Sequence, residues 1–166
     1  PELNLILAPR HPERFGRVEN LLRGRGLPYM KRSELVEMQK TDAIHGAIIL
    51  LDSVGELSAM YGISTIAIIG KSFRGKGGQN PLEAAYWGIP IVCGPHMENF
   101  PVIRDFYDAG AGLQVSEHGL PGALRELLLS PERAGEIGRN ARRMYLKNTG
   151  AVDKAMKIIE KYLEVR

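Results

Sequence analysis

The chain has 166 residues, of which 44% are hydrophobic, and this is enough for one compact domain with a substantial core. Its 22 Lys and Arg residues against 19 Asp and Glu residues leave a formal charge of +3, too small to indicate a nucleic-acid-binding protein. The single cysteine, Cys93, excludes a disulfide framework or a cysteine metal cluster. No apolar run reaches the length of about 20 residues that a membrane span needs. The first residues lack the basic-then-apolar pattern of a signal peptide, and we expect a soluble chain.

Apolar runs, prolines and glycines predict an alternation of strands and helices along the chain. The predicted strands cover residues 3–8, 47–51, 65–69, 91–93 and 113–115, with a weak extended segment over 27–31. The predicted helices cover residues 12–24, 57–61, 81–87, 99–109, 120–129 and 131–166, the last with breaks at Gly138 and Gly150. Pro1 leads straight into the first strand, and we therefore expect the chain to be part of a longer protein.

Strands that are almost wholly apolar and alternate with helices predict an α/β fold, a Rossmann-like parallel sheet flanked by helices. In such open sheets, ligands bind beyond the carboxyl ends of the strands, where helix N-termini also point. The polar, Gly-rich segments of this chain follow strands. We therefore expect the functional residues there.

The strongest candidate segment follows the strand over 65–69 and includes Gly77 and Gly78, which allow the backbone to approach a ligand closely. Asn80 is a favourable N-cap and Pro81 suits the first helical position, so the helix start offers free N–H groups to a phosphate. Glu83 in the same turn could accept hydrogen bonds from the two hydroxyls of a ribose. An ordinary capped helix after a flexible loop remains the alternative interpretation.

Two further segments follow strands of the first half. Arg10 comes after the first strand, held between prolines, and an arginine can grip a phosphate or a pyrimidine edge; a rigid turn with exposed polar side chains is the alternative. In the turn over 52–56, Gly55 would let the main chain meet a base edge. Ser53 and Glu56 could also cap the following helix reciprocally, and both interpretations are compatible.

Other polar residues are weaker candidates. The cations Lys71, Arg74 and Lys76 could contact phosphate, although solvated loop charges are commoner. His96 could contact a substrate or be an ordinary turn residue. The histidines lack metal-ligand spacing, which argues against a zinc site. The sequence has no GxSxG elbow, and no GxGxxG follows the first strand, which argues against a hydrolase and a dinucleotide dehydrogenase.

Four segments in one order resemble the C-terminal domain of 3-deoxy-D-manno-octulosonic acid (Kdo) transferases, GT-B glycosyltransferases of lipopolysaccharide synthesis. They are PRHPERF at 9–15, DSVGEL at 52–57, GGQNPLEAAYWGIPI at 77–91 and GPHMENF at 94–100. The resemblance covers nearly the whole chain and implies that residues 1–166 are one donor-binding half of a GT-B fold. Gln79 departs from the family, in which many members have His.

The resemblance also implies a function for the whole parent protein. The parent would transfer Kdo from CMP-Kdo to a lipid A precursor at the cytoplasmic side of the inner membrane, which the full-length protein would contact peripherally. It would need no donor-site metal or other cofactor. The general base would belong to an N-terminal acceptor domain that this chain lacks, so no catalytic residue is expected here. The residues implied to contact CMP are Pro9, Arg10, Val54, Gly55, Glu56, Asn80, Pro81, Leu82 and Glu83.

Three alternatives remain open from the sequence. The chain could be the UDP-sugar-binding half of another GT-B enzyme, or a non-catalytic Rossmann-like interaction domain. The absence of an acidic cluster at strand ends argues against a receiver-like domain. Phe73 among Lys71, Arg74 and Lys76 would suit a module that docks on a membrane.

Overall fold

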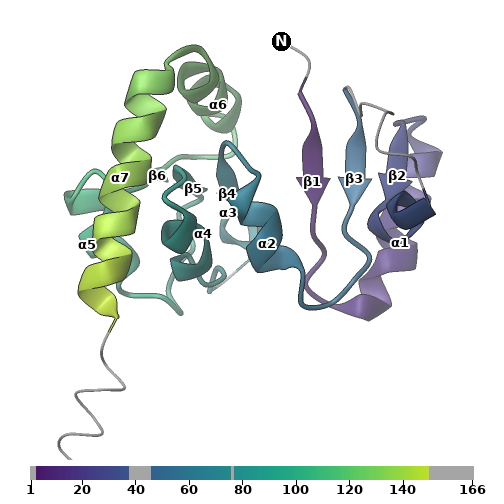
Figure 1. The fold of residues 1–166 in the computed structure, drawn as a ribbon, viewed down its shortest axis with the longest axis horizontal. Helices are drawn as coiled ribbons and strands as arrows, with labels where there is room; N and C mark the ends of the chain where they lie inside the picture. Colours follow the sequence, from purple (N-terminus) through teal and green to yellow (C-terminus); the bar gives the residue numbers. More distant parts are fainter. Residues whose placement is uncertain (1–2, 38–45, 76, 150–166) are drawn as a thin grey trace, which may run out of the picture. The chain divides into compact units, whose positions relative to one another are not determined.

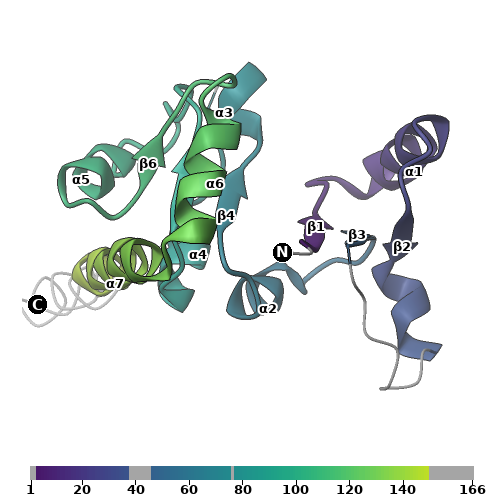
Figure 2. The ribbon, with the colours of Figure 1, turned by 90° about the horizontal axis from the view of Figure 1, so that it is seen from above.

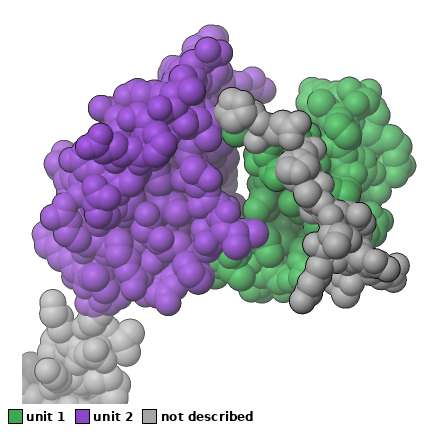
Figure 3. All heavy atoms as spheres, turned by 45° about the horizontal axis from the view of Figure 1, so that its top comes forward, with its two compact units in different colours: residues 1–60 green, residues 61–166 purple. Residues whose placement is uncertain are grey.

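The computed structural model describes residues 3–37, 46–75 and 77–149. The chain divides into two compact units, Pro1–Met60 and Tyr61–Arg166, coloured green and purple in Figure 3. Each unit has its own parallel sheet and is described by itself. The α/β class and the parallel strand pairing predicted from the sequence are confirmed.

The first unit contains a three-stranded parallel sheet in the order β1-β3-β2 (Figure 1). Leu5 of β1 and Tyr29 of β2 both pair with Ile48 of β3, which is therefore the central strand. The elements of this unit are β1 (Leu5–Leu7), the 3-10 helix η1 (Pro12–Arg14), α1 (Phe15–Gly24), β2 (Tyr29–Lys31), the 3-10 helix η2 (Arg32–Glu37) and β3 (Ile48–Leu50). Helix α2 (Leu57–Gly62) leads into the second unit.

The second unit contains a three-stranded parallel sheet in the order β4-β5-β6. Helix α7 packs against α4, α5, α6 and β5, and Figure 2 shows α6 and α7 lying beside each other. The elements after α2 are β4 (Ala67–Ile69), α3 (Lys71–Arg74), α4 (Leu82–Trp87), β5 (Ile91–Cys93), α5 (Ile103–Asp108), β6 (Leu113–Gln114), α6 (Leu120–Leu129) and α7 (Pro131–Asn148). No helix within the described ranges combines the length and the apolar character needed to cross a bilayer.

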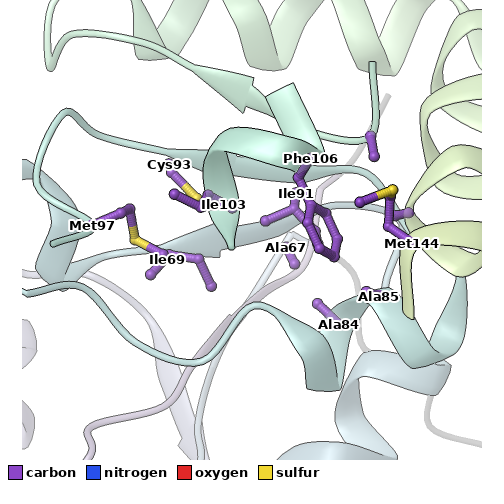
Figure 4. Packing of buried hydrophobic residues seen from close by; sticks show 12 residues of the cluster. Ala67, Ile69, Ala84, Ala85, Ile91, Cys93, Met97, Ile103, Phe106 and Met144 are labelled. Atoms are coloured by element: carbon purple, nitrogen blue, oxygen red, sulfur yellow. The ribbon is translucent and has the colours of Figure 1, made fainter. Parts of the chain in front are cut away.

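The main hydrophobic core surrounds the central strand of the second unit (Figure 4). All three residues of β5 have 0% exposure, because β4 and β6 flank the strand and helices cover the sheet. Phe106 of α5 is also completely buried in this core. Burial raises the pKa of the Cys93 thiol to about 11, since the thiolate would lose its hydration.

The helix break predicted at Gly138 is wrong, because α7 runs without interruption from Pro131 to Asn148. A Cβ atom at position 138 would lie 2.0 Å from the carbonyl oxygen of Gly88, which ends α4 in a left-handed conformation (φ 68°). Gly138 is therefore needed for the close crossing of α4 and α7 and not for a change of chain direction. The predicted break at Gly150 lies outside the described residues.

The structure differs from the sequence-based prediction at three further places. Pro12 begins η1, and α1 starts only at Phe15. The loop predicted over 70–79 contains the short helix α3, whose Ser72 is buried and donates a hydrogen bond to the carbonyl of Ile69. Helix η2 was not predicted, because Arg32–Glu37 has no apolar periodicity strong enough to indicate it.

Candidate functional site

The segments implicated by the sequence follow strands in both units, as predicted. In the first unit, the segments after β1 and β3 start from neighbouring parallel strands, and the Leu51 N–H donates to the Leu7 carbonyl at 2.9 Å. In the second unit, one segment leads from β4 to α4 and another follows β5. Parallel strands bring their carboxyl ends to the same edge, so each sheet presents two candidate segments at one edge.

Arg10 is exposed and has no ion-pair or hydrogen-bond partner among the described residues. Pro9 before it is half-buried, and His11 after it is extended (φ −118°, ψ 130°) before η1 begins. The guanidinium of Arg10 is therefore available to an external anion or base.

The turn after β3 is organised by an ion pair. Val54 is 79% exposed and Gly55 has a φ of 90°, a conformation that favours glycine. The Arg32 guanidinium donates to Glu56 Oε1 at 2.7 Å, and the Ser53 hydroxyl donates to the other oxygen of the same carboxylate. The predicted reciprocal capping of Ser53 and Glu56 is therefore wrong: the two side chains bond to each other.

Arg32 and Ser33 were not predicted as part of this edge, and Asp52 was predicted in the turn over 52–56 but without a role of its own. Asp52 accepts hydrogen bonds from the Ser33 N–H at 2.9 Å and the Ser33 hydroxyl at 2.6 Å. Partial burial acts to raise the pKa of Asp52, but the bonds from Ser33, a bond from its own backbone and the charge of Lys31 together lower the pKa. The signal in the sequence was the polar pair Arg32-Ser33 directly after an extended segment, where a parallel strand ends.

The two glycines before α4 do approach another group closely, but that group belongs to the chain itself. Gly77 and Gly78 have φ values of 99° and 62°. A Cβ at 77 would lie 2.3 Å from the Asn99 amide nitrogen, and one at 78 would lie 2.2 Å from the Met97 sulfur. Packing against the segment after β5 therefore explains both glycines.

Glu98 joins the two segments of the second unit. Its carboxylate accepts a hydrogen bond from the Gly77 N–H at 2.8 Å and lies 3.2 Å from His96 Nδ1. The Asn99 N–H in turn donates to the Gly77 carbonyl at 3.3 Å. Bonds from its own backbone N–H, from Gly77 and from His96 lower the pKa of Glu98. The loop that precedes α4 is thus held in place before any ligand binds.

The start of α4 carries a side-chain cap and an exposed carboxylate. Asn80 Oδ1 accepts a hydrogen bond from the Leu82 N–H at 3.0 Å, although the helix begins one residue later than predicted. Pro81 is fully buried, Leu82 packs on the core and Glu83 is exposed. Burial raises the pKa of Tyr61 to about 12, and the negative charge of Glu83 contributes to this to a smaller extent.

The remaining cationic candidates differ in their surroundings. Arg74 Nε donates to Glu117 Oε2 at 2.9 Å, and a second bond joins the same two side chains. Lys71 is exposed, and Lys76 lies outside the described residues. Among the described residues, no group of three or more His, Cys, Asp and Glu side chains is placed to hold a metal ion. The meeting of the segments of the two units at one ligand stays a prediction.

Comparisons with known proteins give a consistent result. The chain is 36% identical to a 3-deoxy-D-manno-octulosonic acid transferase of Haemophilus influenzae and 34% identical to one of Bordetella pertussis, over 99% and 98% of this chain. It spans 38% of the length of each of these relatives. A crystal structure of the C-terminal CMP-Kdo binding domain of WaaA from Acinetobacter baumannii matches with a TM-score of 0.72 and 30% identity, over 84% of this chain and 72% of that one. No family model matches the chain.

Proposed function

Because the chain belongs to the Kdo transferase family, we propose that residues 1–166 are the nucleotide-sugar-binding C-terminal domain of a GT-B glycosyltransferase and bind CMP-Kdo. The observation that carries this proposal is the similarity, at 30% identity and a TM-score of 0.72, to a domain described as CMP-Kdo binding. The exposed Glu83 beside Asn80 at the start of α4 agrees with such a ligand.

The parent protein would transfer Kdo to a lipid A precursor in lipopolysaccharide synthesis, at the cytoplasmic side of the inner membrane. A further, N-terminal domain would bind the acceptor and supply the general base. Since positioning two substrates supplies a large share of catalysis, this chain alone should bind the donor and transfer nothing.

In the second unit, the segment Asn80–Glu83 would hold the phosphate and the ribose. The Leu82 N–H already donates to Asn80 Oδ1, so the next backbone N–H groups of α4 would bind the phosphate, together with the Asn80 amide nitrogen. The Glu83 carboxylate would accept hydrogen bonds from the ribose hydroxyls, a charge-assisted contact. Pro81 and Leu82 are buried and half-buried, so they would fix the path of the segment.

In the first unit, Pro9, Arg10 and the segment Val54–Glu56 would contact the cytosine side of CMP. The exposed guanidinium of Arg10 supports this role, and so does the exposed main chain at Gly55. The side chain of Glu56 would not contact CMP, because Arg32 and Ser53 already bind its carboxylate. Its N–H and C=O groups would then contact the base, while its side chain keeps the turn in shape.

Calorimetric titration with CMP, UMP and UDP tests the proposal. We expect CMP to bind and the uridine nucleotides to bind more weakly. The Glu83→Ala variant should lose about 10–100-fold in CMP affinity, the usual loss for hydrogen bonds to a charged group. Glu132→Ala is the matched control, because Glu132 is also a first-turn glutamate after a proline, in α7; its affinity should equal that of the wild type.

Two results would contradict the proposal. Tighter binding of UDP than of CMP would indicate the UDP-sugar-binding half of another GT-B enzyme. No heat with any nucleotide, together with unchanged thermal stability, would indicate an interaction domain. Equal CMP affinity in Glu83→Ala and in the wild type would refute only the ribose assignment.

A further inference from the structure

An arginine-aromatic surface lies where α7 crosses the end of α4, and the donor site does not use it. It consists of Tyr86, Trp87, Arg139, Arg142, Arg143 and Tyr145. The three arginines line a shallow hollow of about 440 Å³ on α7. All six residues belong to the second unit, and none is in the segment proposed to hold CMP.

Arg142 ties the aromatic residues of this surface together. Its guanidinium carbon lies 4.5 Å from the Tyr86 ring centroid and 5.3 Å from that of Tyr145. It also donates to the Tyr86 carbonyl. The Tyr86 ring meets the Trp87 ring edge-to-face, with centroids 5.2 Å apart. The surface is therefore contiguous from Trp87 to Tyr145, with Arg142 as its structural centre.

Arg139 and Arg143 are exposed beside Arg142, and no carboxylate in the described part of the chain pairs with either. Elsewhere in the same helix, Arg133 pairs with Glu126 at 2.8 Å. Residues 137–149 include Arg139, Arg142, Arg143 and Lys147 and no Asp or Glu. As far as the structure describes it, this half of α7 therefore carries only positively charged side chains, with Glu136 one turn before Arg139.

The surface also exposes apolar and amphipathic side chains. Tyr86 is 41% exposed, Trp87 44% and the nearby Leu146 of α7 54%. Tryptophan and tyrosine favour the boundary between headgroups and acyl chains, because the apolar part of the side chain can lie among the acyl chains while its polar group contacts water. Arginines attract anionic headgroups, and each cation near an anionic bilayer strengthens binding by about fivefold.

We propose that the arginine-aromatic surface docks the protein on an anionic phospholipid surface, with Arg139 and Arg143 on the headgroup phosphates and Trp87 at the interface. Charge complementarity selects this occupant, because unpaired arginines flanked by interfacial aromatics match an anionic bilayer. Arginine guanidinium groups lie among the exposed aromatic rings, whereas the centre of a protein interface is depleted of most charged residues.

Vesicle binding with the 166-residue chain tests this proposal. Trp87 is the only tryptophan, so its emission reports directly from the surface. Vesicles containing phosphatidylglycerol should sediment the protein and shift Trp87 emission to shorter wavelength, and vesicles of pure phosphatidylcholine should do neither. The double variant Arg139→Gln/Arg143→Gln should lose about 10–30-fold in vesicle affinity.

The matched control is Arg104→Gln/Arg125→Gln, which removes the same charge from exposed positions on α5 and α6. It should bind nearly as well as the wild type. Equal losses in both double variants would refute a specific surface, as would binding that does not need phosphatidylglycerol. A loss confined to Lys71→Gln/Arg74→Gln would assign docking to the loop before α4 instead. Inorganic phosphate and sodium chloride are compared at the same ionic strength. If phosphate releases the protein from the vesicles and chloride does not, the surface binds a soluble anion and the proposal is refuted.

Discussion

Single charged side chains determine how the candidate segments are held. Glu98 fixes the loop before α4 through the Gly77 N–H, and Arg32 fixes the turn after β3 through Glu56. Neither contact was predicted, because both join residues far apart in sequence and depend on how parallel strands bring their ends together. Asn80 as a cap and Glu83 as an exposed first-turn carboxylate could be predicted, since local sequence determines both.

The lowered pKa of Glu98 predicts an acid-sensitive contribution to stability. A carboxyl group whose pKa is lower in the folded than in the unfolded state stabilises the fold above the unfolded value and loses this contribution as pH falls through the folded one. Between about pH 5 and about pH 3, the melting temperature of the wild type should therefore fall more than that of Glu98→Gln. Thermal melts across this range test it, and parallel curves would show that Glu98 contributes nothing.

The Arg32–Glu56 pair predicts an indirect effect on nucleotide binding. Removing Arg32 leaves the Glu56 carboxylate without its cation, so it should repel an anionic ligand and loosen the turn. Arg32→Gln should weaken CMP binding by about 3–10-fold. Arg17→Gln removes an exposed arginine elsewhere in the first unit and should have no effect. An unchanged calorimetric affinity in Arg32→Gln would separate Arg32 from the donor site.

At the scale of elements, glycines mark close approaches whose meaning depends on the partner segment. The sequence alone predicts that Gly138 interrupts a helix, since glycine is a poor helix former. The structure places the Gly88 carbonyl against it instead. Similarly, Gly77 and Gly78 make room for Asn99 and Met97 and not for a ligand. The positions of such glycines are readable from sequence, but what approaches them is a tertiary property.

Gly138→Ala should therefore destabilise the chain. The new methyl group would clash with the Gly88 backbone and push α7 away from α4, at a cost of about 1–3 kcal/mol. Gly122→Ala in α6 is the control, because nothing lies within 4 Å of the added Cβ; better helix propensity should raise its stability by up to about 1 kcal/mol. Urea unfolding of both variants tests this, and a stabilised Gly138→Ala would refute the close crossing.

At the scale of the whole molecule, the buried core is distributed unevenly. Among the described residues, the buried hydrophobic side chains of the first unit are Leu22, Leu50 and Leu51, whereas both core clusters belong to the second unit. Composition predicted one core for the chain, but it could not predict this imbalance. The imbalance arises because β5 is covered by several helices.

This distribution predicts different behaviour of the separated units. Residues 61–166 expressed alone should unfold cooperatively, whereas residues 1–60 alone should not, since a 60-residue chain with so small a core is marginal. Circular dichroism melts of both pieces test this. A cooperative transition in residues 1–60 together with none in residues 61–166 would reverse the assignment of the main core.

The isolation of Cys93 makes the protein convenient to label. A thiol with 0% exposure and a pKa of about 11 carries little thiolate at neutral pH, so maleimides should spare it in the folded chain. A cysteine introduced at an exposed position could then carry one fluorophore without prior removal of the native one. Nucleotide and vesicle titrations could be followed with such a dye while the core remains chemically untouched.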